Sequence, residues 1–153
     1  MDVYEVLSDG FKLSTDKDLL DLELIYKVLS GTYWAENIPV EVIAKSVEHS
    51  LCFGLYHGDG QQLGFARMVT DRATFAYLAD VFVIPGYRGK GLSKFMMKAI
   101  LEHPDMKGLR RIMLATRDAH GLYKQFGFTA VPNPEIFMQI HRPGIYKNQI
   151  QND

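Results

Sequence analysis

The most constraining feature of the sequence is one long apolar segment, Thr74–Ile84 (TFAYLADVFVI), which ends at Pro85-Gly86. Apolar side chains occupy both of its alternating faces, and this pattern is typical of a strand covered from above and below. A glycine-containing loop follows, and apolar residues then recur at helical spacing at Leu92, Phe95, Met96, Ala99 and Ile100. The segment therefore predicts a central strand that runs through a loop into a packed helix.

The residues before this strand predict two helices and a hairpin. Thr15 and Asp18 form a capping-box pattern for a helix that continues to about Ser30, and a second helix begins at Pro39. Strand-forming runs at 51–56 and 63–69 flank a turn that contains an Asp-Gly pair. Phe11–Ser14 is expected to be the first strand.

The residues after it predict a strand, a short helix and two closing strands. The strand is Leu109–Thr116, and Asp118 is expected to cap a helix over Ala119–Phe126. Phe128–Val131 and Glu135–His141 are the expected closing strands. The order of elements predicts a mixed α/β (α+β) fold in a single domain over residues 1–153.

The composition excludes several classes of protein. Of 153 residues, 23% are charged and the net charge is −1, so no basic surface for nucleic acid is expected. No apolar run approaches the roughly 18 residues of a membrane-spanning helix. The single cysteine, Cys52, has no internal disulfide partner, and Met1–Gly10 does not resemble a signal peptide. We therefore expect a cytoplasmic protein that needs neither a membrane nor a nucleic-acid partner.

The loop Tyr87–Ser93 (YRGKGLS) is a candidate phosphate site. Gly89 and Gly91 allow backbone N–H groups to turn toward one anion, and the following helix adds the positive end of its dipole. A tight turn without a ligand is the alternative. A dinucleotide fingerprint would need glycine at Lys94, and a P-loop would need Gly-Lys-Ser/Thr where Leu92-Ser93 stand, so neither motif fits.

Three segments in order resemble the GNAT superfamily of acyl-CoA-dependent N-acetyltransferases. Arg88, Gly91 and Ser93 resemble its acyl-CoA loop, although Ser93 replaces the usual glycine or alanine. Leu78–Val83 resembles its fourth strand, and residues 119–128 resemble its A-x-x-L-Y-x-x-x-G-F segment. Thr116 stands where the family often has asparagine. The resemblance implies a central, mostly antiparallel sheet with splayed fourth and fifth strands, flanked by about four helices.

The resemblance also implies a function and a set of cofactor contacts. The expected reaction moves the acetyl group of acetyl-CoA directly to a primary amine of a small molecule or peptide. Backbone groups of Val81, Phe82 and Val83 would bind the pantetheine arm and the acyl carbonyl. The residues around the pyrophosphate would be Arg88, Gly89, Lys90, Gly91, Leu92, Ser93 and Lys94. The rival interpretation is a noncatalytic acyl-CoA-binding domain that regulates or binds a partner.

Two side chains are candidates for catalysis. Tyr123 matches the family's tyrosine that donates a proton to the departing thiolate, or it packs as a core aromatic beside Leu122 and Phe126. Asp80 is the one carboxylate of an apolar strand, on the face expected to hold Leu78 and Phe82. It is either a base or ammonium ligand, or a structural carboxylate paired with an arginine or backbone donors.

The remaining candidates concern the acceptor, metals and assembly. Tyr33 and Trp34, with Glu36, lie between the first two helices and either hold a cationic amine or close the domain as an apolar patch. Cys52 is expected to be a buried strand residue, and Asp71 a turn residue. The histidines show no metal-ligand spacing, so no metal is expected. Exposed sheet edges favour a homodimer.

Overall fold

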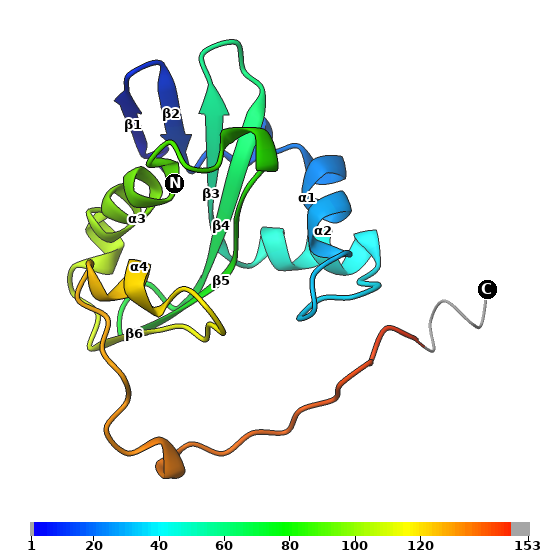
Figure 1. The fold of residues 1–153 in the computed structure, drawn as a ribbon, viewed down its shortest axis with the longest axis vertical. Coiled ribbons are helices and arrows are strands. Elements are labelled where there is room, and N and C mark those ends of the chain that lie inside the picture. The colour runs from blue at the N-terminus through cyan, green and yellow to red at the C-terminus, as the bar shows by residue number, and fades with distance from the viewer. Residues whose placement is uncertain (1, 148–153) are drawn as a thin grey trace.

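The architecture is a six-stranded sheet with helices on both faces (Figure 1), seen in a computed structural model that describes residues 2–147. The strands follow one another across the sheet in chain order. They are β1 (Glu5–Ser8), β2 (Phe11–Ser14), β3 (Leu51–His57), β4 (Gln62–Thr70), β5 (Phe75–Val83) and β6 (Arg111–Met113). All neighbours are antiparallel except β5 and β6, which are parallel. The expected mixed fold with a mostly antiparallel sheet is confirmed.

The helices divide into two pairs, one on each face of the sheet. They are α1 (Leu22–Leu29), α2 (Val40–Glu48), α3 (Leu92–Leu101) and α4 (His120–Lys124). Figure 1 shows α1 and α2 on one side of the strands and α3 and α4 on the other. Alternation along β3 explains the two cores, since Phe53 packs with Met96 of α3 while Cys52 packs with Ile25 of α1. Both faces of the central strands are therefore buried.

A β-bulge interrupts β5 at Asp80. The register runs from the pair Phe65 and Phe82 to the pair Arg67 and Ala79, so two residues of β5 stand opposite one residue of β4. Asp80 itself adopts the left-handed region, with φ of 58°. The extra residue places Leu78 in the α3-side core and Phe82 in the α1-side core. The prediction that both share a face with Asp80 is therefore wrong.

The predicted helix caps are also wrong in position. The chain is extended at Leu20 after a short turn, so α1 begins only at Leu22, where the side chain of Asp21 accepts from the N–H of Leu24 at 3.0 Å. At α4 the cap is not Asp118. The hydroxyl of Thr116 reaches three residues ahead and accepts from the N–H of Ala119 at 3.0 Å.

The two predicted closing strands do not form. Residues 129–141 are exposed, and their one regular element is a short 3-10 turn at Pro134–Ile136. Pro132 and Pro134 remove two backbone donors, and a strand without a neighbour has no partner for its backbone groups. Figure 1 shows this part of the chain running away from the sheet. β1 was missed by the sequence analysis, and β6 is shorter than predicted.

Candidate active site

The site begins where β5 and β6 part. β6 pairs only with the first three residues of β5, Phe75–Tyr77. Among the residues that the structure describes, none forms a strand beside the β6-facing edge of β5 from Leu78 to Val83. This is the expected splay, and it leaves backbone groups available for a ligand that lies along the strand.

The hydrogen bonds at the end of β5 show which groups face the gap. The N–H of Ile84 donates to the carbonyl of Leu63 in the β4 direction at 2.8 Å. Because backbone groups alternate along a strand, the N–H and carbonyl of Val83 point the other way. The Nε of Arg88 donates to the carbonyl of Val83 at 2.9 Å from that side. The N–H of Val83 is therefore directed toward the gap.

The glycine loop lies between this strand end and α3. Gly89 and Gly91 have φ of 80° and 77°, a region that side-chain-bearing residues rarely adopt. Gly91 is the residue that precedes α3, and no side chain caps the helix there. A Cβ atom on either glycine would meet no other atom within 4 Å. The N-terminal N–H groups of α3 thus face open space, as an anion site requires.

The charged residues of the loop differ in their surroundings. Arg88 is tied through its Nε to the end of β5, and its remaining guanidinium donors are available to a ligand. The ammonium of Lys90 lies 5.1 Å from the ring centre of Tyr87. Lys94, on the first turn of α3, is exposed, and Ser93 is partly buried. The loop therefore offers positive charge, and no ion pair joins Arg88, Lys90 or Lys94 to an acidic residue of the part of the chain that the structure describes.

A pocket of about 370 Å³ adjoins the unpaired part of β5. It brings together the three groups that the sequence analysis treated separately, namely Asp80, Tyr123 and the pair Tyr33 and Trp34. The other lining residues are Tyr77, Leu78, Ala79, Val81, Leu114, Ala115, Thr116, Asp118 and Ala119. One wall comes from β5, one from the residues after β6 with α4, and the rim comes from the segment between α1 and α2.

Tyr123 lies on α4 with its side chain buried, 9% exposed. Its ring packs edge-on against Phe128, with 5.7 Å between ring centres. Burial, and then the negative charge of Asp118, raise the pKa of its hydroxyl above the ordinary value of 10. The phenol is therefore protonated at neutral pH, which is the form that can donate a proton.

Asp80 is held by two donors. The Nε1 of Trp34 donates to its Oδ1 and the Nε of Arg67 donates to its Oδ2, both at 2.9 Å. Arg67 also donates through Nη1 to the hydroxyl of Ser50 at 3.0 Å. The side chains of Arg67 and Asp80 are only 18% and 11% exposed. Both carboxylate oxygens are thus engaged, one of them by a permanent positive charge.

The rim of the pocket is aromatic and cationic. Tyr33 and Trp34 are about half exposed and meet edge to face, with 5.0 Å between ring centres. The guanidinium carbon of Arg117 lies 3.5 Å from the ring centre of Tyr33. This contact joins the segment between the first two helices to the residues after β6. Glu36 is exposed and does not line the pocket.

Three residues of this arrangement were missed by the sequence analysis: Arg67, Ser50 and Arg117. A charged residue inside the apolar run of β4 was a readable signal for Arg67, because a buried charge needs a partner. Nothing in the sequence distinguishes Ser50 or Arg117 from other polar residues of the chain.

Other candidates lie outside the pocket. Cys52 is 1% exposed, and burial raises the pKa of its thiol to about 11, so it is an inert core residue as predicted. Asp71 accepts three backbone N–H bonds in its turn, also as predicted. Within residues 2–147, no cluster of three metal-binding side chains occurs, and no helix is long and apolar enough to cross a membrane.

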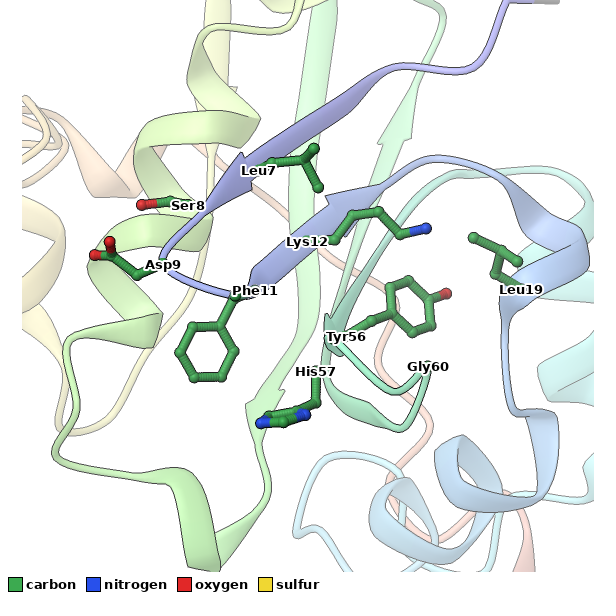
Figure 2. Close-up of a pocket in the computed structure, with 11 residues that line it drawn as sticks. Leu7, Ser8, Asp9, Phe11, Lys12, Leu19, Tyr56, His57 and Gly60 are labelled. Carbon is green, nitrogen blue, oxygen red and sulfur yellow. The ribbon is translucent and has the colours of Figure 1, made fainter.

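A different cavity, of about 540 Å³, lies at the β1–β2 hairpin (Figure 2). Lys12, Tyr56 and His57 border it together with the two neighbouring turns. It contains none of the residues to which a catalytic or binding role was assigned. The candidate catalytic and acceptor-binding side chains lie instead in the pocket beside β5.

The comparisons with known proteins agree with this geometry. Residues 17–128 match the family model described as the acetyltransferase (GNAT) family. The chain belongs to the GNAT acetyltransferase family, and it is an acyltransferase. This assignment disfavours the rival interpretation of a noncatalytic binding domain.

Individual relatives support the same assignment. A Gibberella zeae protein named as an acetyltransferase is 33% identical over 135 residues, covering 74% of this chain and 75% of that protein. A crystal structure of a GNAT acetyltransferase from Xanthomonas campestris is 50% identical, with a TM-score of 0.87, and covers 90% of this chain and 97% of its own. An acetyltransferase from Clostridium acetobutylicum, solved with acetyl-CoA, is 12% identical with a TM-score of 0.60 over 86% of this chain and 94% of its own, and shows the fold alone.

Proposed function

We propose that the protein transfers the acetyl group of acetyl-CoA directly to a primary amine. The observation that carries the proposal is the unpaired edge of β5 from Leu78 to Val83, with an anion site at one end and the pocket of Tyr123 at the other. An extended thioester with a diphosphate at its far end matches this arrangement. The solved structure of the Clostridium acetobutylicum relative with acetyl-CoA supports the choice of donor.

The loop and strand bind the donor. The N–H groups that follow Gly91, the dipole of α3 and the cations of Arg88, Lys90 and Lys94 hold the pyrophosphate. Backbone groups of Val81, Phe82 and Val83 hold the pantetheine arm. The N–H of Val83 faces the gap and donates to the pantetheine arm, and the acyl carbonyl lies further along the strand, in the pocket that Val81 and Tyr123 line.

Tyr123 serves as the general acid. The neutral amine attacks the carbonyl carbon, so a C–N bond forms, the C–S bond breaks, and the amine loses one proton to solvent. Tyr123 donates its hydroxyl proton to the departing thiolate sulfur and is reprotonated from solvent. Burial raises its pKa above the ordinary 10, so the phenol keeps this proton at neutral pH.

Tyr33, Trp34 and Asp80 bind the acceptor. The two aromatic rings attract a cationic amine as it enters. Asp80 is a positioning residue, since its Oδ1 accepts from Nε1 of Trp34 and orients that ring while Arg67 binds its Oδ2. Its negative charge favours the ammonium form on entry. Both carboxylate oxygens are already engaged by donors, so we assign no side chain as the base.

Donor binding is tested by calorimetric titration with acetyl-CoA. Gly91→Glu places a side chain and a negative charge where the pyrophosphate would lie, so micromolar binding by the unaltered protein should be lost. Gly108→Glu adds the same charge at another open glycine, outside the loop, and should bind normally. Circular dichroism checks that both variants fold. Absence of binding by the folded, unaltered protein would contradict the proposal.

Catalysis is tested by screening primary amines for release of free thiol. Tyr123→Phe should lower kcat about 100-fold, because general acid catalysis contributes at least that factor, while acetyl-CoA still binds. The kcat of the unaltered enzyme should also fall at pH values above the raised pKa of Tyr123, and this fall should vanish in the variant. An unchanged kcat in Tyr123→Phe would remove the residue from the mechanism.

A further inference from the structure

The rim of the pocket beside β5 carries two charged side chains of opposite sign. Arg117 and Asp118 follow one another in the bend between β6 and α4, and both are exposed. Within residues 2–147 no ion pair engages either of them, although they are neighbours in the chain. The other carboxylate of the pocket, Asp80, is already paired with Arg67. Among the described residues, the uncompensated charges at this rim are therefore one positive and one negative.

The guanidinium of Arg117 lies flat on the ring of Tyr33. Its central carbon is 3.5 Å from the ring centre, which is van der Waals contact. An edge-on guanidinium would bring a nitrogen atom well inside that distance, so the two planes lie face to face. The N–H donors lie in the guanidinium plane and therefore point sideways, not into the ring. Stacking thus fixes the orientation of the cation and leaves its donors available to a ligand.

Tyr33 is itself held in place, so it can support this cation. Its ring meets Trp34 edge to face with 5.0 Å between ring centres. Nε1 of Trp34 in turn donates to Asp80 at 2.9 Å. A chain of contacts therefore runs from the bulge of β5 to the guanidinium of Arg117. Such support is what a substrate-binding residue needs, because donors that are oriented before the ligand arrives cost less entropy on binding.

Asp118 lines the pocket because another residue has taken the capping role expected of it. The hydroxyl of Thr116 accepts from the N–H of Ala119, and the Asp118 carboxylate makes no hydrogen bond within the described part of the chain. Burial, and then the charge of Asp118, raise the pKa of the Tyr123 hydroxyl, so the carboxylate lies near that hydroxyl. A carboxylate in this position can bind the ammonium group of an entering amine.

We propose that the acceptor is a small zwitterion, a primary amine that also carries a carboxylate or a phosphate. Arg117 binds the anionic group, and Asp118 binds the ammonium group as the acceptor enters. A plain amine matches only Asp118, and a diamine brings its second cation beside Arg117, so charge complementarity favours the zwitterion over both. A guanidinium with in-plane donors also suits the paired oxygen atoms of such an anion. This acceptor class rests on the proposed acetyl transfer and narrows it.

Paired acceptors test the preference for an anion. Several amino acids are each compared with the amine that lacks only the carboxylate, such as phenylalanine with phenethylamine, and phosphoethanolamine is compared with ethanolamine. In one kind of pair, the anionic member should have a kcat/KM at least about tenfold higher, because a hydrogen bond to a charged group contributes that factor. If no pair favours its anionic member, the zwitterion is overturned. Acetylation of the plain amines and calorimetric binding of acetyl-CoA then show whether the proposed function stands without it.

Variants test whether Arg117 is the residue that selects the anion. Arg117→Gln should bring the ratio within each pair to about one, through a higher KM for the anionic member and no higher KM for the plain amine. Arg110→Gln removes another exposed arginine, one that does not line the pocket, and should leave the ratio unchanged. Tyr33→Leu should also lower the ratio, since the guanidinium loses its support, whereas Asp118→Asn should raise the KM of both members alike. A preference that survives Arg117→Gln in a protein with an unchanged circular dichroism spectrum overturns the assignment.

Discussion

At the scale of single residues, Asp80 is the most informative position. This one residue has a left-handed backbone conformation, lies in the β-bulge of β5, and forms an ion pair with Arg67. Asn and Asp tolerate this backbone region better than other residues with a side chain, which explains why a carboxylate can occupy it. The backbone turns Asp80 toward Trp34 and Arg67, so a local distortion creates the link between the strand and the acceptor rim.

The ion pair predicts a clear pattern of stability. Arg67→Met should lower the free energy of unfolding by about 3 kcal/mol, because it leaves a mostly buried carboxylate unpaired. Asp80→Asn in the same chain should recover most of this loss, since the amide is neutral and keeps the favoured backbone region. Urea denaturation of the two single variants and the double variant measures the coupling. If the losses of unfolding free energy in the two single variants simply add in the double variant, Arg67 and Asp80 are not coupled.

The same variants separate the two roles considered for Asp80. As a positioning residue, Asp80→Asn should raise the KM for the amine and leave kcat within about tenfold of its normal value. A general base would instead lose about 100-fold or more in kcat.

Tyr56 predicts a stabilising substitution. Its side chain is 2% exposed and its hydroxyl has no hydrogen-bond partner among residues 2–147. A buried hydroxyl without a partner costs about 1 kcal/mol or more. Tyr56→Phe should therefore raise the free energy of unfolding by about 1 kcal/mol, measured by urea denaturation.

Tyr4 supplies the matched control. Its hydroxyl donates to the carbonyl of Ala99 in α3 at 2.7 Å. Tyr4→Phe removes the same atom but also a real bond, so it should lower stability by about 1 kcal/mol. The two identical substitutions should thus have opposite signs. Equal losses would mean that the Tyr56 hydroxyl is satisfied in solution.

At the scale of elements, the sequence predicted what periodicity and local chemistry determine. The strand–loop–helix unit around β5 and α3 was predicted closely because apolar spacing and glycines fix it locally. The bulge at Asp80 was not, since it depends on the register between β4 and β5. The closing strands failed for a related reason, because a strand pattern in the sequence does not show whether a neighbouring strand is available to pair with it.

In the candidate site too, local motifs were predictable from the sequence and the contacts between them were not. Tyr123, Asp80, Tyr33 and Trp34 were found as separate motifs, and the pocket shows them together. Their connections through Arg67 and Arg117 arise from tertiary packing. A single sequence does not contain that information.

The element after α3 predicts a pH effect on stability. His103 caps the 3-10 turn Pro104–Met106 by accepting from the N–H of Asp105 through Nδ1 at 3.0 Å, and its ring packs against Tyr4 and Phe53. Burial, which is the main cause, lowers its pKa below the ordinary 6.5. The unfolded chain therefore takes up the proton first. The contribution of His103 is complete above about pH 6.5 and is lost as the pH falls through the folded-state pKa.

This effect is measured by urea denaturation at about pH 7.5 and pH 5.5. His103→Asn keeps an acceptor for the cap but cannot be protonated, so its stability should fall less over this range. The same loss in the variant as in the unaltered protein would assign the pH dependence to other groups.

At the scale of the whole molecule, the two helix pairs act on the sheet in different ways. α3 and α4 cover one face, beside the glycine loop and with Tyr123, while α1 and α2 cover the other, with Tyr33 and Trp34 in the segment between them. In the proposed function, the donor and the acceptor thus approach β5 from opposite layers. This arrangement keeps the two binding functions separable, so a change in the segment between α1 and α2 can alter acceptor choice without disturbing the donor loop.

The parting of β5 and β6 has a consequence beyond chemistry. A stretch of strand edge inside a sheet is an adhesive surface, because any extended chain that enters the gap can pair with it. A ligand that lies in the gap covers this edge, so binding of the proposed donor should lower the tendency of the protein to associate with other chains through β5.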